Sequence, residues 1–217
     1  MNKVAGNKVS GVVCAVAMAV LMAGCAGGPT KPSSFPPSQR PVAAVLDFEY
    51  KASATAYADT AAGLAESVTA ALASTGRVKL VERSRLKAVL AEATLGLTGA
   101  VDPSTAAKMG QLTGAEYLIT GSITRIAIRD EFRSVVVATK TERIVDIEAE
   151  ARMIEVKTGL LVASARAVNH AEGAEKHLIG AKPGLVPAAE AIVQTAMIGL
   201  GEKLAYELAG SIEPKDK

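Results

Sequence analysis

One ten-residue stretch, IVDIEAEARM, constrains the fold of this chain more than any other. Val145, Ile147, Ala149, Ala151 and Met153 occupy every second position, and each residue between them is charged. Strict alternation over this length is typical of a β-strand with one buried and one wet face. Antiparallel sheets are commonly covered on one side only, so the stretch predicts such a sheet.

The surrounding sequence extends this pattern into a set of antiparallel strands between about residues 135 and 168. In MIEVKTGLLVASARAV, the tripeptide at 157–159 is a typical hairpin turn. The other elements that we expect are strands at 42–48, 77–82 and 116–128 and helices at 60–75, from Ser84, at 103–112 and at 187–208. The order β-α-β-α-α-β-β-β-β-α predicts the α/β class, a single domain with a mixed sheet and helices packed on it.

Local signals indicate where the helices begin and end. Asp59 or Thr60 is expected to cap the first helix, and Gly76 to end it in a left-handed conformation. Pro103, after an Asp, begins the short helix, and Gly114 ends it. The last helix carries an apolar stripe of Ile192, Val193, Ala196, Leu200, Leu204 and Leu208.

The N-terminus has the pattern of a targeting segment. Lys3 and Lys8 precede about 15 apolar or small residues, too few for a spanning helix of about 20. The tripeptide Ala-Gly-Cys that follows resembles the bacterial lipoprotein signal, in which the cysteine is lipidated and becomes the new N-terminus. The resemblance implies a signal peptide at 1–24, cleavage after Gly24 and lipidation of Cys25. An ordinary signal peptide and an uncleaved anchor are the alternatives.

The next segment is rich in Gly, Pro and Ser. Residues 25–41 are therefore expected to form a lipidated cysteine and a flexible tether, followed by the folded domain at 42–212. At about 3.1 Å per residue such a tether spans up to roughly 50 Å. Ala26 follows the cysteine where an Asp would imply retention in the inner membrane, so the resemblance implies the periplasmic face of the outer membrane.

Composition excludes several classes of protein. The chain has 24 basic and 22 acidic residues, and loss of Lys3 and Lys8 with the signal leaves a formally neutral protein. We therefore expect no nucleic-acid partner. Cys25 would be the only cysteine of the mature chain, so no disulfide or cysteine-based metal site is expected.

Few residues suggest catalysis, and each has a simpler interpretation. His170 and His177, near Glu172 and Glu175, lack tight metal-ligand spacing, so a solvated loop is favoured over a zinc site. Asp47 ends the first strand and more simply bonds a loop or caps a helix.

Two further motifs also fail as catalytic signals. Ser122 has no GxSxG context, and the glycines of LGLTGAVDPS are not followed by GK[ST].

The acids at 146, 148 and 150 form a solvent face, with a partner-binding face as the alternative. We therefore expect no enzyme, no cofactor and no metal.

Several segments together resemble a known family. VAAVLDFE, LVERSRL, GAEYLITGSI and the hairpin with VKTG look like the curli-assembly CsgG/HfaB lipoprotein family over about residues 42–168. The core is also similar to that of LpoB-type penicillin-binding-protein activators and the TolB N-terminal domain.

In the curli secretion protein the resemblance implies a ring whose subunits each insert two β-hairpins into a barrel. The corresponding segments here are IAIRDEFRSVVVATKTERIVDIE, which is highly charged, and VNHAEGAEKHLIGAKPGLVP, which lacks β alternation. Charges on a lipid-facing surface cost about 2–4 kcal/mol each near the midplane. We therefore expect the scaffold without the barrel.

These expectations together predict a function, with two alternatives to it. We expect a non-enzymatic outer-membrane lipoprotein that faces the periplasm and contacts protein partners in assembly or export of an envelope component. The alternatives are a ring-forming secretion channel, which makes the chain a homo-oligomer, and an LpoB-like activator of a peptidoglycan synthase.

Overall fold

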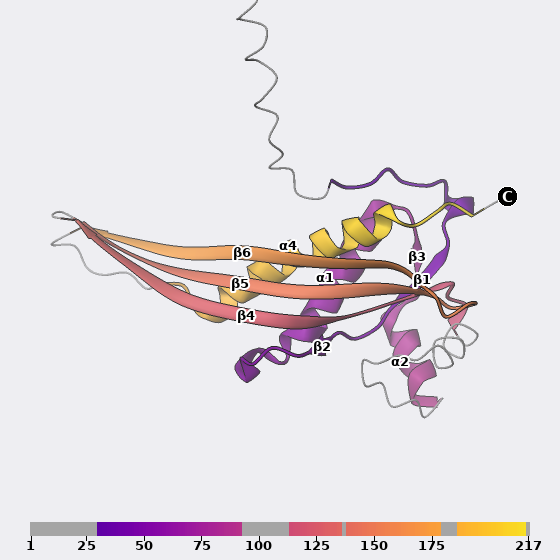
Figure 1. Ribbon diagram of the computed structural model, residues 1–217, viewed down its shortest axis with the longest axis horizontal. Coiled ribbons are helices and arrows are strands. Elements are labelled where there is room, and N and C mark those ends of the chain that lie inside the picture. The colour runs from indigo at the N-terminus through magenta and orange to yellow at the C-terminus, as the bar shows by residue number, and fades with distance from the viewer. Residues whose placement is uncertain (1–29, 93–112, 136–137, 179–185, 216–217) are drawn as a thin grey trace, which may run out of the picture.

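The computed structural model describes residues 30–92, 113–135, 138–178 and 186–215. Within them lie six strands, three α-helices and two short 3₁₀ helices (Figure 1). The elements are η1 (Pro37–Gln39), β1 (Val42–Val45), β2 (Glu49–Tyr50), η2 (Thr55–Tyr57), α1 (Thr60–Thr75), β3 (Lys79–Leu80), α2 (Arg83–Glu92), β4 (Tyr117–Val135), β5 (Ala138–Glu155), β6 (Leu161–Leu178) and α4 (Ala189–Gly210). The helix expected at 103–112 lies outside the described residues.

The strands form one mixed sheet in the order β3-β1-β4-β5-β6, with β2 beside β4. β1 is parallel to β3 and β4, whereas β4, β5 and β6 are antiparallel. Strand and helix alternate first, and an antiparallel meander follows. The predicted fold class, a mixed sheet with helices packed on it, is confirmed.

The meander differs from the prediction in its strand lengths. β4 has 19 residues, and β5 and β6 have 18 each, so three long strands replace the four shorter ones that were expected. A register shift between Ile123 and Arg125 leaves Thr124 as a bulge, which reverses the faces of β4. After the bulge, Ile126 and Ile128 take over the core-facing positions that Ile123 held.

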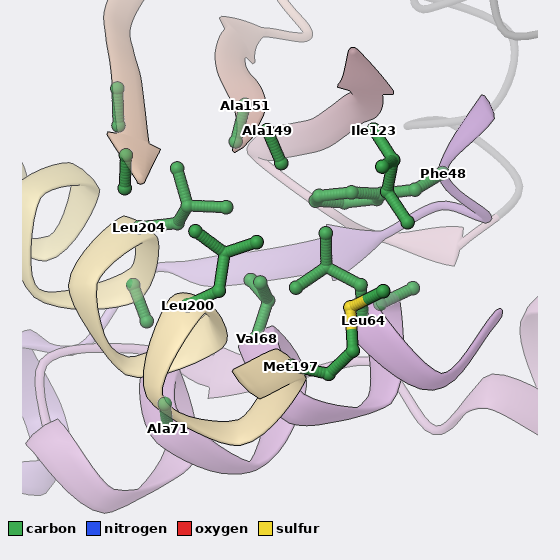
Figure 2. Packing of buried hydrophobic residues seen from close by; sticks show 14 of the residues in the cluster. Phe48, Leu64, Val68, Ala71, Ile123, Ala149, Ala151, Met197, Leu200 and Leu204 are labelled. Carbon is green, nitrogen blue, oxygen red and sulfur yellow. The ribbon is translucent and has the colours of Figure 1, made fainter. Parts of the chain in front are cut away.

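α1 and α4 cover one face of the sheet (Figure 1). In Figure 2, Met197, Leu200 and Leu204 of α4 lie among Leu64 and Val68 of α1 and the core-facing side chains of the strands. The predicted core residues of β5 and of the α4 stripe are all buried. α2 lies on the opposite side, where Leu86 packs with Leu118 of β4, and residues of β1 alternate between the two clusters.

Small residues let α4 lie close to α1 and to β6. An added Cβ on Gly201 of α4 would lie 2.6 Å from the Cβ of Ser67 in α1. An added Cβ on Gly173 of β6 would lie 2.7 Å from Ile192 Cδ1. Side chains at these two positions would separate the layers, so packing explains both glycines.

The predicted helix ends are partly confirmed. Gly76 has φ 64° and ends α1, and Gly114 has φ 70°. Asp59 occupies the N-cap position of α1 without a side-chain cap bond. At α2 the carboxylate of Glu82 accepts from the Ser84 N–H at 2.8 Å, a cap that the sequence analysis missed. The Ser84 hydroxyl also donates to this carboxylate, and this bond, followed by those from the Ser84 and Arg85 N–H groups, lowers the pKa of Glu82.

Residues 34–41, the N-terminal strap, lie against the domain. The Phe35 N–H donates to the Gly76 carbonyl at 3.1 Å, and the Arg77 guanidinium lies 4.2 Å from the Phe35 ring centroid. The Lys215 N–H donates to the Gln39 carbonyl at 2.9 Å, so the strap and the C-terminal residues are joined. These contacts therefore involve residues of the segment that was expected to form a tether.

None of the helices in the described residues is both long enough and apolar enough to cross a bilayer.

Candidate protein-binding face

The sheet surface opposite α1 and α4 on β4, β5 and β6 is here called the open face. It consists of the side chains that alternate with the core positions: Ser122, Arg125, Arg129, Glu131 and Arg133 on β4, Lys140, Glu142, Asp146, Glu148, Glu150 and Arg152 on β5, and Ser164, Arg166, Val168, His170 and Glu172 on β6. Acids predominate on the central strand, and cations lie on both neighbours. Opposite charges on adjacent strands attract across the sheet.

One cluster of charged side chains on the open face is centred on Asp146. Its carboxylate pairs with the Arg129 guanidinium from β4 and lies 2.8 Å from His170 Nδ1 on β6. The hydrogen bond with His170 and, after it, the one with Arg129 lower the pKa of Asp146. Because an ionised carboxylate only accepts, Nδ1 is the donor. One acid thus links all three strands.

A second group of side chains lies nearer to the start of β6. Arg166 of β6 donates to Glu148 Oε1 of β5. Arg152 lies 3.4 Å from Glu150 Oε1, and the Ser122 hydroxyl donates to the same oxygen at 3.4 Å. A hollow of about 500 Å³ is bordered by Glu150, Arg152 and Arg166, together with Leu161, Ser164 and, from α4, Glu207. Its walls carry both signs of charge, which suits a polar partner surface of mixed charge better than a strongly charged ligand.

Apolar side chains are exposed beside this group. Leu160, Leu161 and Val162, at the turn into β6, are 64%, 57% and 41% exposed, and Val168 on the open face is 53% exposed. Large exposed apolar groups within a polar surround are typical of contact sites. The sequence signal for these side chains is the LLV tripeptide directly after the turn at 157–159.

The segment that contains the two histidines is a strand and not a loop. His170 and His177 both belong to strand β6, opposite Asp146 and Thr139, so the expectation of a solvated loop is wrong. The side chains of β6 alternate by size, with Ala167, Ala171 and Gly173 toward α4. Within the described residues, no group of three or more His, Cys, Asp or Glu could hold a metal ion.

The other two candidate catalytic residues have structural partners. Asp47 is exposed, and its carboxylate pairs with Arg83 at the start of α2. Ser122 is 2% exposed, and the partner found for its hydroxyl is Glu150. Gly24, Cys25 and the glycines of LGLTGAVDPS lie outside the described residues.

Comparison with known proteins identifies one family. The model described as "Curli production assembly/transport component CsgG" matches residues 30–182, more than half of the chain. No curated protein sequence matches.

Several solved structures are similar to this chain at low identity. The LpoB C-terminal domain from Salmonella enterica has 19% identity and a TM-score of 0.44, over 60% of this chain and 83% of that one. Lipoprotein GNA1162 from Neisseria meningitidis has 11% identity and a TM-score of 0.45, over 71% and 92%. The PelC dodecamer from Paraburkholderia phytofirmans has 12% identity and a TM-score of 0.37, over 81% and 94%.

Proposed function

This chain belongs to the CsgG family of curli production assembly/transport components, and we therefore propose that it acts by contacting other proteins rather than by catalysing a reaction. It is a lipoprotein anchored through Cys25 on the periplasmic face of the outer membrane, with the signal removed after Gly24. It contacts protein partners in the assembly or export of a surface component. The Ala-Gly-Cys motif at 23–25 supports the anchor, and the family match supports the process.

The open face is the observation that carries the contact function. Asp146 and Glu148 are held by cations on neighbouring strands, so little ordering of these side chains is required when a partner binds. Val168 supplies an apolar contact among them. Such a preformed surface of mixed charge selects a partner by complementarity.

Tethering makes modest affinity sufficient. If the strap remains docked, a link of residues 26–33 joins it to the lipidated Cys25. At about 3.1 Å per residue it holds the domain within roughly 25 Å of the lipid. Confinement in so thin a layer raises the effective concentration of a partner on the same membrane.

A matched pair of photo-crosslinking positions tests the contact surface. Val168 on the open face is 53% exposed, and Ile198 on the outer side of α4 is 59% exposed. A photoreactive residue at 168 is expected to crosslink a protein in intact cells, and one at 198 is not. Arg166→Ala should remove the 168 crosslink if the charges of the open face position the partner. Equal crosslinking from both positions would exclude a contact specific to this face.

The identity of the crosslinked protein then separates the process alternatives. A secretion or assembly component supports the proposal, whereas a peptidoglycan synthase supports the activator alternative.

A second candidate is a ring-forming secretion channel, and the long strands favour it. A membrane-crossing strand needs about 9–11 residues, and β4, β5 and β6 are longer than this. The charges on both faces oppose it, since Asp130 and Arg143 pair on the side of α4 while the open face is charged too. Extraction in detergent followed by sizing and conductance measurements separates the two, because only a channel gives a conducting ring.

A further inference from the structure

One long edge of the sheet has no strand beside it in the part of the chain that the structure describes. β6 is the last strand in the order β3-β1-β4-β5-β6, and its neighbour is β5 (Figure 1). An unpaired edge presents main-chain N–H and C=O groups that can pair with another strand. Natural proteins usually protect such an edge, so the groups that lie beside β6 decide whether it can accept a strand.

The hairpin between β5 and β6 sets which residues of β6 face the free edge. The Glu155 N–H donates to the Leu160 carbonyl at 2.9 Å, so the main chain of Glu155 faces β6. Main-chain direction alternates along a strand of an antiparallel pair, so Ala151 also faces β6, where Ala165 lies opposite it. The residues of β6 that direct their N–H and C=O groups to the free edge are therefore Ser164, Arg166 and Val168.

Lys203 of α4 agrees with this direction and closes one end of the free edge. Its Nζ donates to the Val168 carbonyl at 2.8 Å and to Asn169 Oδ1 at 2.8 Å. A lysine beside an edge strand is a common protection against pairing. No bond from another part of the described chain reaches the main chain of Ser164 or Arg166. The N–H and C=O groups of these two residues are therefore free to pair.

The hollow bordered by Glu150 and Arg152 extends around this edge. Its lining includes these two residues on the open face and Glu207 of α4, the helix that covers the opposite face. Because β6 is the outermost strand, a hollow that reaches both faces passes its edge. Residues 164–166 line it consecutively. The free edge of β6 thus forms one side of a groove, and α4 borders the other.

The side chains beside the groove indicate which segment fits it. Glu207 is exposed on the side of α4, so a basic residue of the segment is favoured there. On the open face, the Arg166 side chain is 74% exposed and favours an acidic residue, and the exposed Val168 favours an apolar one. Successive side chains of a strand point to opposite faces. A complementary segment therefore alternates apolar or acidic residues with basic ones.

We propose that the edge of β6 at residues 162–168 binds an extended segment of a partner protein as an additional antiparallel strand. Main-chain hydrogen bonds to Ser164 and Arg166 hold the segment, and the alternating side chains select it. In a β6–β6 pair of two copies, both α4 helices would lie on the same face beside the shared edge, so a single strand fits better. This inference rests on the proposed contact function and names the partner as a chain with an unpaired, extended segment.

A short peptide that alternates valine or glutamate with lysine tests the main-chain bonds. Fluorescence anisotropy with the native protein in detergent should show binding of the labelled peptide. In an antiparallel pair, residues opposite Ser164 and Arg166 share their face and bond to them. N-methylation of the valines and the glutamate should therefore weaken binding about tenfold or more, whereas N-methylation of the lysines should leave it unchanged. Equal effects of the two modifications, or no binding of the unmodified peptide, would overturn the proposal.

Matched variants locate the site on the protein. Ser164→Pro removes the outward N–H, and Ser164→Ala removes only the hydroxyl. Proline is tolerated on an edge strand, and circular dichroism checks that both variants fold. Ser164→Pro should weaken peptide binding about tenfold, and Ser164→Ala should not. If Ser164→Pro does not fold, the N-methylated peptides still decide the question.

A charge exchange tests the side of α4. Glu207→Lys should weaken binding of the lysine peptide by about two- to fivefold and strengthen binding of a peptide with glutamates in place of the lysines. The same effect of Glu207→Lys on both peptides would contradict the assigned orientation of the segment.

The crosslink from position 168 separates failure of this inference from failure of the contact function. If that crosslink persists in cells with Ser164→Pro while no peptide binds, the contact function stands and strand addition is wrong. If Ser164→Pro instead converts a dimer into a monomer on sizing, the edge binds a second copy, which also overturns the proposal.

Discussion

The contact between α1 and α4 at Gly201 leads to a sharp prediction about stability. An added Cβ would lie 2.6 Å from Ser67 Cβ, 2.9 Å from the Ser67 carbonyl carbon and 3.0 Å from the Val68 nitrogen. Two of these atoms belong to the backbone of α1, so a side-chain rotation cannot relieve the overlap. Overpacking in a core costs about 1–3 kcal/mol, and the upper part of that range applies here. Ala is preferred to Gly inside a helix by about 1 kcal/mol. Gly201→Ala should therefore reduce the free energy of unfolding by about 1–2 kcal/mol.

Gly63 provides the matched control, since an added Cβ at this position of α1 meets nothing within 4 Å. Gly63→Ala makes the same chemical change in a helix and should raise the free energy of unfolding by up to about 1 kcal/mol. Urea unfolding followed by circular dichroism measures both variants. If Gly201→Ala were as stable as the wild type while Gly63→Ala gained stability, the two helices would not pack as closely as described.

Three further variants test the core, the open face and the strap. Leu204→Ala removes a side chain that is 0% exposed. It should lower the free energy of unfolding, measured by chemical denaturation, by about 2–5 kcal/mol, whereas a loss below about 1 kcal/mol would place Leu204 outside the core. Hydrogen bonds with His170 and Arg129 hold the pKa of Asp146 below its ordinary value. The ionised carboxylate therefore stabilises the folded protein at any pH above the pKa of the unfolded state, and this stability is lost as the pH falls through the pKa of the folded state. Asp146→Asn should be less stable than the wild type at neutral pH by up to about 1 kcal/mol, with no difference in strong acid, and a pH-independent difference would contradict the ion pairs. Phe35→Ala removes the ring beneath the Arg77 guanidinium. It should speed amide hydrogen exchange in residues 34–41 and lower the free energy of unfolding by about 0.5–1 kcal/mol. Unchanged exchange in these residues would show that Phe35 does not hold the strap.

Elements with a regular hydrophobic period were predictable from the sequence. Val145 to Met153 alternate without interruption, and the stripe from Ile192 to Leu208 recurs with the helical period, so both core faces are those expected. Gly76 and the turn at Gly159 were predictable because a positive φ is strongly biased toward glycine.

The outer half of β6 was not predictable from hydrophobicity. Its core side presents Asn169, Ala171 and Gly173, where α4 lies too close for larger side chains. Asn169 Nδ2 instead donates to the Ala196 carbonyl at 2.8 Å. Along this half of β6 the side chains therefore alternate in size rather than in hydrophobicity. When only apolar residues are counted, such a segment resembles a loop.

Two other features depend on contacts between distant residues. The bulge at Thr124 shifts the alternation of β4 by one residue, which made a single long strand look like separate pieces. The strap depends on Phe35 meeting Arg77, and nothing in a Pro-rich stretch indicates which of its residues will dock. On the open face the acids were predicted, but their cross-strand partners required the register.

Mass spectrometry of the N-terminal peptide of the native protein, purified from membranes, tests the central claim most directly. An anchored protein that acts by contact should begin at Cys25, with a mass increased by a diacylglyceryl group and acyl chains. An unmodified Cys25, or a chain that begins at Met1, would contradict the account.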